Sequence, residues 1–504
     1  MYQSEVTTIL AETDGKRDRD HREFAQFLLV PRLDDPIRNF CAQRGWHVQG
    51  VADLSFCHHP GLTVTRADGS ERSMLCAGDI FDSRDPLASN ATIVGRLAQT
   101  CATPSQLERA LDDLGGRWVI AASFPSGAFV YHDAGALKSI CVYRTDARLV
   151  LGSQPGLVAA VYGLTPNQDR VRQISAAGAP SWPIWASPYD GVYMLPPNHR
   201  VDLTRARVER YWPPEPLGER AMAGASAEIF QATSTLIAAM TARRRCYLGL
   251  TAGYDSRMLA ACSRDCHDRL AMFTMTGRPS RMDKPTDLSD EAIPAAIARR
   301  LGARYKREAF DTNLSPRARQ TLSNNAAGMY RDQALRKTLA YRQVAGDDGV
   351  VLQALGGELL RTFYTAGSTG KRSNVEQIVA RTEFRDVPFA NEGVHTWLQD
   401  VPEAGIDPLV LLYWEQRFGI WASLGLTARE AMVEIWSPFN CRRILQAALE
   451  VPAVDRRPPY RLVQGVIARG DPALLRIPFN TSFRSRLVRA LPVPWRVKRY
   501  LGWA

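Results

Sequence analysis

The sequence predicts a two-domain α/β protein in which a strand-rich α+β part is followed by a part built on a parallel sheet. Three observations support this prediction. The chain has 504 residues, which is too long for one compact core. Short apolar runs punctuated by Gly and Pro fill residues 1–210 and read as strands. After a proline-rich break, apolar strands alternate with amphipathic helices, which is typical of a parallel sheet with helices on both faces.

Composition narrows the class of protein further. Hydrophobic residues make up 45% and charged residues 23%, as in ordinary soluble globular proteins. We find no apolar run of the roughly 18 residues that a membrane span needs, no signal-peptide pattern, and no paired spacing among the nine cysteines. We therefore expect a cytoplasmic protein without stable membrane insertion. The net charge of +11 suggests an anionic partner, but no nucleic-acid motif is present, and ATP with an acidic or peptide substrate would suffice.

The first domain, placed at residues 1–210, contains six runs that we expect to be strands. They are residues 24–30, 62–64, 118–122, 128–132, 139–143 and 149–152. A Pro-Ser-Gly turn between the third and fourth runs predicts a hairpin. The segment that begins Tyr-Trp-Pro-Pro-Glu-Pro at position 211 is stiff and is the best candidate linker, which we place at residues 211–224.

The second domain, placed at residues 225–504, shows the alternating pattern. We expect a helix at 225–242, a strand at 247–250, a helix that begins near 257, and a strand at 270–275. A polar loop at 278–289, a helix at 291–301 and another strand within 349–355 follow. From position 313 the pattern is mainly helical. In a doubly wound parallel sheet, a ligand is expected at the carboxyl ends of the strands.

The most informative motif lies at such a strand end. Residues 251–256 read Thr-Ala-Gly-Tyr-Asp-Ser, between an apolar strand and a helix. Small residues before a helix N-terminus leave backbone N–H groups pointing at one spot, where an anion can bind. Asp255 beside that anion makes sense if Mg²⁺ bridges the two, and no Walker Gly-Lys-Ser/Thr is present. The motif predicts a nucleotide-pyrophosphate site; an ordinary strand–turn–helix corner is the alternative.

This motif resembles the Ser-Gly-Gly-x-Asp-Ser signature of the PP-loop ATP pyrophosphatases, which cleave ATP to AMP and pyrophosphate. Further segments extend the likeness: Leu-Gly-Gly-Arg-Trp from 114, Leu-Val-Leu-Gly-Ser-Gln-Pro from 149, Ser-Asp-Glu from 289, Gln-Ala-Leu-Gly-Gly-Glu-Leu-Leu-Arg from 353, and Glu-Ile-Trp-Ser-Pro-Phe-Asn from 434. Together they resemble the asparagine synthetase class B superfamily. The resemblance implies an N-terminal glutaminase-like, Ntn-type α+β sandwich and a C-terminal PP-loop domain with a doubly wound sheet and extra helices.

The chain also departs from that family. Active class II glutaminases use a cysteine directly after the initiator Met, whereas this chain has Tyr2 there and its first cysteine is Cys41. Without the thiol no acyl-enzyme forms with glutamine, so we expect the first domain to serve structure or substrate binding. Arg257 after the Asp-Ser pair, a loop centred on Glu358, and the degenerate first domain favour lasso-peptide cyclases. The β-lactam-type synthetases are implied to use a Tyr–Glu pair, and by our alignment that Tyr position falls on Leu355.

The resemblance therefore implies an ATP-dependent, AMP-forming ligase of lasso-peptide biosynthesis. Such an enzyme would adenylate an Asp or Glu side chain of a precursor core peptide, and the N-terminal amine of that peptide would attack and close a macrolactam. The expected partners are this ribosomally made peptide and the leader-peptide protease or recognition protein of the same pathway. A small-molecule amide or lactam synthetase of the same superfamily, and a non-catalytic peptide-binding module on the inherited fold, stay open as alternatives.

The implied site residues fall into three groups. Asp255 and Glu358 are the expected Mg²⁺ ligands. The expected nucleotide-binding set is Leu250, Thr251, Ala252, Gly253, Asp255, Ser256, Thr274, Met275, Gly356 and Gly357. The expected catalytic set is Asp255, Arg257, Glu358, Arg361, Glu415 and Glu434. In this last set the arginines would offset the charge of departing pyrophosphate.

Each assignment has an alternative. Glu415 and Glu434 would orient or deprotonate the attacking amine, but a helical salt bridge with a neighbouring arginine accounts for Glu415 equally well. The adenine-flanking strand around Thr274 could be plain sheet core. The lysine that the family carries near its C-terminus is missing from residues 477–483, so its role is left unassigned.

Overall fold

A computed structural model describes residues 24–51, 54–145, 148–276, 289–309, 316–329, 332–363, 375–402 and 405–479. Two sequence predictions fall outside these ranges: the consequence of Tyr2, and nearly all of the polar loop at 278–289. The two sheets at the start of the chain and their helices are called the front half, and the part from residue 222 onward the back half.

The front half contains two six-stranded sheets in which every pairing is antiparallel. The first sheet has the order β10 (Val192–Met194), β8 (Cys141–Thr145), β9 (Arg148–Gly152), β1 (Phe27–Val30), β3 (Leu54–His58), β2 (His47–Val51). The second has the order β12 (Arg207–Arg210), β11 (His199–Asp202), β7 (Gly127–His132), β6 (Leu114–Phe124), β5 (Ser73–Asp82), β4 (Val64–Asp68).

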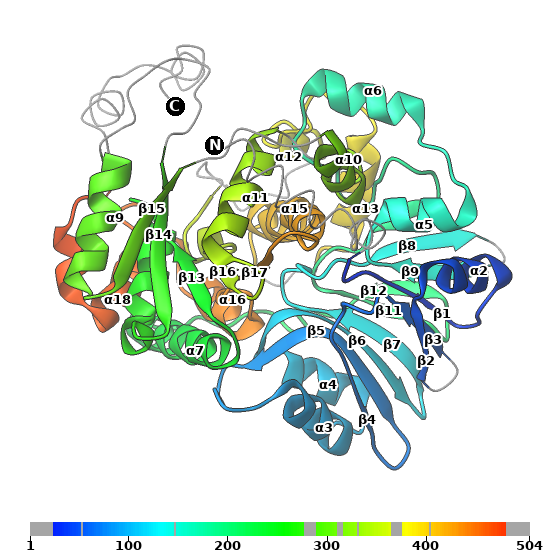
Figure 1. The fold of residues 1–504 in the computed structure, drawn as a ribbon, viewed down its shortest axis with the longest axis horizontal. Helices are drawn as coiled ribbons and strands as arrows, with labels where there is room; N and C mark the ends of the chain where they lie inside the picture. The colour runs from blue at the N-terminus through cyan, green and yellow to red at the C-terminus, as the bar shows by residue number, and fades with distance from the viewer. Residues whose placement is uncertain are drawn as a thin grey trace, which may run out of the picture.

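These sheets stack face to face, and helices cover their outer faces (Figure 1). Strand β1 shows why: Phe27 and Leu29 join the core between the sheets, whereas Leu28 and Val30 join the core on the other side. This is the two-residue period of a strand that is buried on both faces. Helices α2 (Asp35–Arg44) and α5 (Pro155–Tyr162) lie on the first sheet, and α3 (Asn90–Thr100) and α4 (Pro104–Leu111) on the second. The predicted α+β sandwich is confirmed as an arrangement of layers.

The back half is built on a five-stranded sheet in which every pairing is parallel. Its order is β15 (Arg304–Ala309), β14 (Leu270–Thr276), β13 (Cys246–Gly249), β16 (Val350–Leu352), β17 (Glu434–Trp436). Helices α9 (Ser289–Arg300) and α11 (Asp332–Ala345) lie on opposite faces of this sheet (Figure 1). The predicted parallel sheet with helices on both faces is confirmed, and its strand order is doubly wound.

The remaining helices pack around this sheet or join the two halves. Helix α7 (Met222–Arg243) contacts α8 (Tyr254–Cys262), α18 (Arg461–Gly470) and strand β5 of the front half. The others are α6 (Gln168–Ala177), η1 (Arg264–Cys266), α10 (Pro316–Asn325), η2 (Gly357–Leu360), α12 (Val375–Val379), α13 (Ala390–Gln399), α14 (Pro408–Leu412), the π-helix η3 (Tyr413–Trp421), α15 (Ala422–Arg429), α16 (Arg442–Leu449), α17 (Ala453–Arg456) and η4 (Pro472–Arg476).

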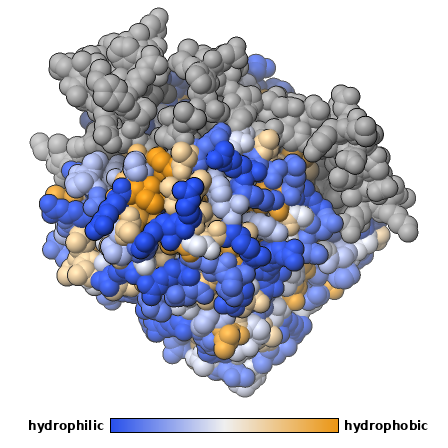
Figure 2. Space-filling view, turned by 60° about the vertical axis from the view of Figure 1, so that its left-hand side comes forward, coloured by the Kyte–Doolittle hydropathy of each residue, from blue (hydrophilic) through white to orange (hydrophobic). Residues whose placement is uncertain are grey.

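The connection between the halves is packed at its start and mostly exposed from residue 214 to residue 221. Within residues 211–224, which the sequence predicts as a linker, Trp212 is buried and α7 already begins at Met222. In the described part of the chain, none of the helices combines the length and the apolarity that crossing a membrane requires. Figure 2 shows the face on which α9 and α18 lie, and its surface is mainly hydrophilic with small apolar patches.

Candidate active site

Two loops meet where the strand order of the parallel sheet reverses. After β13 the chain continues to β14 and β15 on one side, and it returns to β16 and β17 on the other. At such a switch point the loops that follow the two central strands diverge and leave a crevice for a ligand. The loop after β13 contains residues 250–253, and the loop after β16 contains residues 353–356. These are the two segments in which the sequence places the nucleotide site.

The first loop ends at the N-terminus of α8. The helix begins at Tyr254, so Asp255 and Ser256 lie in its first turn. Gly253 is the N-cap residue and supplies no side-chain cap to this helix, so its first-turn N–H groups are available to an anion. Ser256 closes the loop, because its hydroxyl accepts a hydrogen bond from the Thr251 N–H at 3.0 Å and lies 2.9 Å from the Thr251 hydroxyl.

The residues expected near adenine lie beside this loop. Thr274 donates its hydroxyl to the Leu250 carbonyl at 2.8 Å, and both residues are buried with Ala252. Met275 is half-buried one position further along β14. Both interpretations, an adenine wall and a plain sheet core, are compatible with this placement.

The second loop approaches the first closely because it contains two glycines. Gly356 has a φ of +85°, which favours glycine, and a Cβ there would lie 2.8 Å from the Phe418 ring. A Cβ on Gly357 would lie 2.9 Å from the Cβ of Asp255. A larger residue at 357 would push this segment away from Asp255, and one at 356 would push it away from the Phe418 ring. The glycine pair therefore brings Glu358 to the side of Asp255.

Among the described residues, two carboxyl groups and one arginine meet at this point. Arg361 holds Asp255 with two hydrogen bonds, from Nε to Oδ1 at 2.9 Å and from Nη2 to Oδ2 at 2.6 Å. Burial raises the pKa of Glu358, and the neighbouring charge of Asp255 raises it further. Two carboxyl groups thus share one arginine, which is the condition under which a carboxyl group retains its proton or takes up a cation.

Sequence reasoning missed one partner of Glu358. Tyr413, the first residue of the π-helix η3, makes a side-chain hydrogen bond with Glu358, and burial raises the pKa of its phenol. The sequence alignment places the family's Tyr position on Leu355, whose carbonyl accepts a hydrogen bond from Ser437. Tyr413 lies on a different element, and no local pattern around position 413 points to this contact.

Arg257 lies against the first loop, where its Nη2 donates to the Ala252 carbonyl at 3.4 Å, but its shorter hydrogen bonds are made elsewhere. Its guanidinium is completely buried and donates to the carbonyls of Leu474, Ile477 and Pro478 at 2.6–3.0 Å. The Phe479 ring covers it at 3.7 Å, and burial lowers the pKa of Arg257 to about 10. In this arrangement Arg257 anchors the segment after α18, and Arg361 is the arginine that faces the carboxylates.

The two remaining carboxylates lie elsewhere. Glu415 is buried in a cluster with Arg210 of the front half, so its salt bridge is with an arginine distant in sequence. Glu434 is the first residue of β17 and pairs in register with Val350, at the amino ends of the strands. Its carboxylate contacts Arg117 at 3.2 Å. The structure therefore brings Asp255, Glu358 and Arg361 together, and it does not bring Glu415 or Glu434 to them.

The groups at this point can be compared with the ligands that Mg²⁺ prefers in proteins. Among the described residues, no group of three or more His, Cys, Asp or Glu side chains could hold a metal. Mg²⁺ in nucleotide sites needs only one or two carboxylates, because phosphate oxygens and waters complete its shell. Asp255 and Glu358 are such a pair, and the pKa of Glu358 is raised first by burial and then by the charge of Asp255. The pair fits a metal that arrives with a nucleotide.

The chain is similar to known proteins only distantly where a likeness is found. No family model matches the chain. No curated protein matches it. The chain has a distant likeness to glutamine phosphoribosylpyrophosphate amidotransferase from B. subtilis complexed with ADP and GMP, at 11% identity and a TM-score of 0.24, covering 66% of this chain and 70% of that one. A structure of the allosteric regulatory enzyme of purine biosynthesis gives 11% identity, a TM-score of 0.25, and coverage of 66% and 69%. TM-scores this low carry no argument about fold or activity.

Proposed function

We propose that this protein is an ATP- and Mg²⁺-dependent ligase that forms amide bonds through an acyl-adenylate. A substrate carboxylate would attack the α-phosphorus of ATP and release pyrophosphate, and an amine would then displace AMP from the acyl group. The observation that carries the proposal is the meeting of Asp255 and Glu358 at the switch point of a doubly wound sheet, beside an uncapped helix N-terminus.

The residues around the crevice would have different roles in this reaction. The first turn of α8, with the hydroxyls of Thr251 and Ser256, would hold the pyrophosphate part of ATP. Asp255 and Glu358 would hold Mg²⁺, which offsets phosphate charge when it is bound. Arg361 would then be released from one carboxylate and stabilise the leaving pyrophosphate. Leu250, Thr274 and Met275 would flank the adenine.

For the substrate, we propose a precursor core peptide whose N-terminal amine closes a macrolactam on an Asp or Glu side chain. This lasso-peptide cyclase assignment rests on the sequence resemblance. We also propose the corresponding domain division: a degenerate glutaminase-like domain at 1–210, a linker at 211–224, and a PP-loop synthetase domain at 225–504. The leader-peptide protease or recognition protein of the pathway would be its partner.

One observation favours a second candidate. The Tyr413–Glu358 hydrogen bond supplies a tyrosine–glutamate pair beside the proposed metal site. The sequence alignment argues against small-molecule lactam synthetases because Leu355 stands at the family's Tyr position. A tyrosine delivered from η3 weakens that argument, so a small-molecule amide or lactam synthetase stays the main rival.

Pyrophosphate release separates these candidates. The full chain is incubated with ATP and Mg²⁺, either with synthetic peptides that have a free N-terminal amine and an internal Asp or Glu, or with small β-amino acids. We expect peptide-dependent release together with loss of one water from the peptide mass. Release with the small amino acids alone would favour the rival. If no condition gives release, the proposed function is refuted and a non-catalytic binding protein is favoured.

A further inference from the structure

The π-helix η3 (Tyr413–Trp421) lies between the candidate active site and the front half. π-helices are rare, and they occur frequently at functional sites. This one is almost entirely buried between α14 and α15. One set of its contacts is made with residues 353–361, which we call the Glu358 loop. Another set is made with the front half.

Two aromatic residues of η3 contact the Glu358 loop. Tyr413 makes a hydrogen bond with Glu358 itself. The Phe418 ring packs so closely on Gly356 that a Cβ there would lie 2.8 Å from it. The position of η3 therefore fixes one side of the loop.

Three consecutive residues of η3 bond to other elements, mainly in the front half. Trp414 donates its indole N–H to the carbonyl of Ala134 at 2.8 Å. Gln416 donates to the carbonyl of Trp182 at 2.8 Å. Between them, Glu415 accepts hydrogen bonds from Arg210 and from two further side chains.

Glu415 is the strongest of these attachments. Arg210 donates to both oxygens of its carboxylate, at 2.5 and 2.9 Å. Asn198 donates to one oxygen at 2.8 Å, and the Trp397 indole donates to the other at 2.6 Å. Arg210 and Asn198 belong to the front half. The carboxylate of Glu415 is completely buried and accepts four hydrogen bonds. Because η3 could not shift without breaking these bonds, they fix its position.

Packing reinforces the attachment. A Cβ on Gly135 of the front half would lie 2.6 Å from the Phe418 ring, the same ring that covers Gly356. A Cβ on Gly419 would lie 2.5 Å from the ring of Pro197. The Phe418 ring is thus held between a front-half turn and the Glu358 loop.

We infer that Arg210 and Glu415 are positioning residues through which the front half sets the geometry of the Glu358 loop. They act by holding η3 so that Tyr413 and Phe418 stay against that loop. The effect on catalysis rests on the proposed function, whereas the effect on the loop does not. The front half is therefore a fixed part of the candidate active site.

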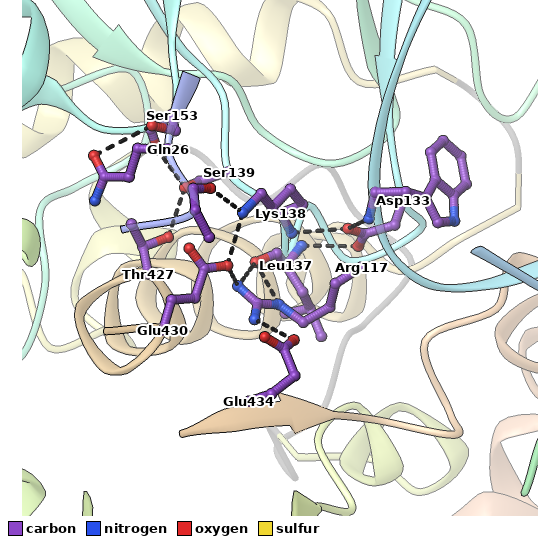
Figure 3. Close-up of polar contacts among 12 residues, drawn as sticks. Gln26, Arg117, Asp133, Leu137, Lys138, Ser139, Ser153, Thr427, Glu430 and Glu434 are labelled. Carbon is purple, nitrogen blue, oxygen red and sulfur yellow. Dashed lines mark hydrogen bonds and ion pairs between the residues drawn. The ribbon is translucent and has the colours of Figure 1, made fainter. Parts of the chain in front are cut away.

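Hydrogen–deuterium exchange tests the inference without any ligand. The variants are Glu415→Gln and the milder Arg210→Lys, which keeps the charge and loses the planar fork. The matched control is Glu430→Gln, which breaks the second buried ion-pair cluster between the halves (Figure 3) and leaves the contacts of η3 intact.

We expect exchange in residues 353–361 to become roughly tenfold faster in Glu415→Gln, and to a smaller degree in Arg210→Lys, than in the Glu430→Gln control. If all three variants change this segment equally, or if none does, the inference is overturned. Should Glu415→Gln fail to fold, the comparison of Arg210→Lys with the control decides.

Kinetics supply a second readout once pyrophosphate release is measurable. We expect kcat/KM for ATP to fall roughly tenfold in Arg210→Lys, because Glu358 would hold the metal that arrives with ATP, and to change less than about twofold in Glu430→Gln. Equal losses in the two variants would overturn the positioning role. If the wild type releases no pyrophosphate, the proposed function fails and the exchange experiment still decides this inference.

Discussion

Two clusters of carboxylates and cations in this molecule differ in how their charges are paired. Between the halves, Arg117 forms ion pairs with both Glu430 and Glu434, and Lys138 gives Glu430 a second cation (Figure 3). At the strand ends, Arg361 pairs with Asp255, and Glu358 forms no ion pair with a described residue. We call these the interface cluster and the strand-end cluster.

Their exposure differs at the centre of each cluster. In the interface cluster the side chains of Arg117, Lys138 and Glu430 are 2–4% exposed, and Glu434 at its edge is 27% exposed. At the strand ends, Arg361 is 23% and Asp255 17% exposed. Charges that are paired and buried have little to offer a ligand, whereas a reachable pair of carboxylates beside one arginine does. The difference shows that ion pairing and access, more than residue type, mark the candidate site.

The largest expected effect is on turnover. Asp255→Asn removes one of the two proposed metal ligands, and we expect pyrophosphate release to fall by about 100-fold or more. The control is Glu209→Gln, because Glu209 also accepts two hydrogen bonds from one arginine, Arg200, and is equally exposed at 17%. Equal losses in both variants would contradict the assignment of the strand-end cluster.

The interface cluster should respond in stability instead. Lys138 donates to Glu430 at 2.9 Å and to the Ala25 carbonyl at 2.7 Å, and both side chains are buried. Lys138→Met leaves a buried carboxylate with one partner fewer, and we expect the free energy of unfolding to fall by about 3–5 kcal/mol. Urea denaturation measures this change. A loss below about 1 kcal/mol would show that the cluster is not the structural element described above.

The glycine contact offers a finer test. Gly357→Ala would place a methyl group 2.9 Å from the Asp255 Cβ, so the two loops must separate. We expect a loss of about 1–3 kcal/mol in unfolding free energy and weaker binding of ATP with Mg²⁺. Gly425→Ala in α15, where a Cβ meets nothing within 4 Å, is the control and should stabilise the helix slightly.

The smallest expected effect is a dependence on pH. The pKa of Glu358 is raised, so near and below this raised pKa the carboxyl group carries a proton that a metal must displace. We expect the affinity for Mg²⁺ with ATP to increase with pH, by at most about tenfold per unit, until Glu358 is ionised. Calorimetry in buffers of different ionisation enthalpy would count the released proton. Glu358→Gln should lack this release, and an unchanged proton count in that variant would exclude Glu358 as its source.

Parts of this arrangement follow from local sequence signals. The strand before Thr251, the helix after it and the glycine pair before Glu358 all carry such signals, and they lie where the sequence predicts. Strand β15 (Arg304–Ala309) does not, because it is a largely exposed edge strand and four of its six residues are charged. Strands β3 (Leu54–His58) and β5 (Ser73–Asp82) are also missing from the sequence prediction.

Contacts between distant segments could not be predicted in this way. The hydrogen bond between Tyr413 and Glu358 depends on where a π-helix lies, and nothing in residues 413–421 signals it. Glu415 pairs with Arg210, which belongs to the other half of the chain. The partner of Glu415 is therefore not an arginine near it in the sequence. The turning of Arg257 toward carbonyls near residue 477 depends on the same kind of tertiary contact.

We propose above all that the strand-end cluster binds a metal–nucleotide complex. Isothermal titration calorimetry of the full chain with Mg²⁺ and a non-hydrolysable ATP analogue tests it most directly, with Asp255→Asn and Glu209→Gln beside the wild type. The account predicts Mg²⁺-dependent binding to the wild type and to Glu209→Gln, with binding to Asp255→Asn weakened by at least about tenfold. Binding that is absent from the wild type, or unchanged in Asp255→Asn, would contradict it.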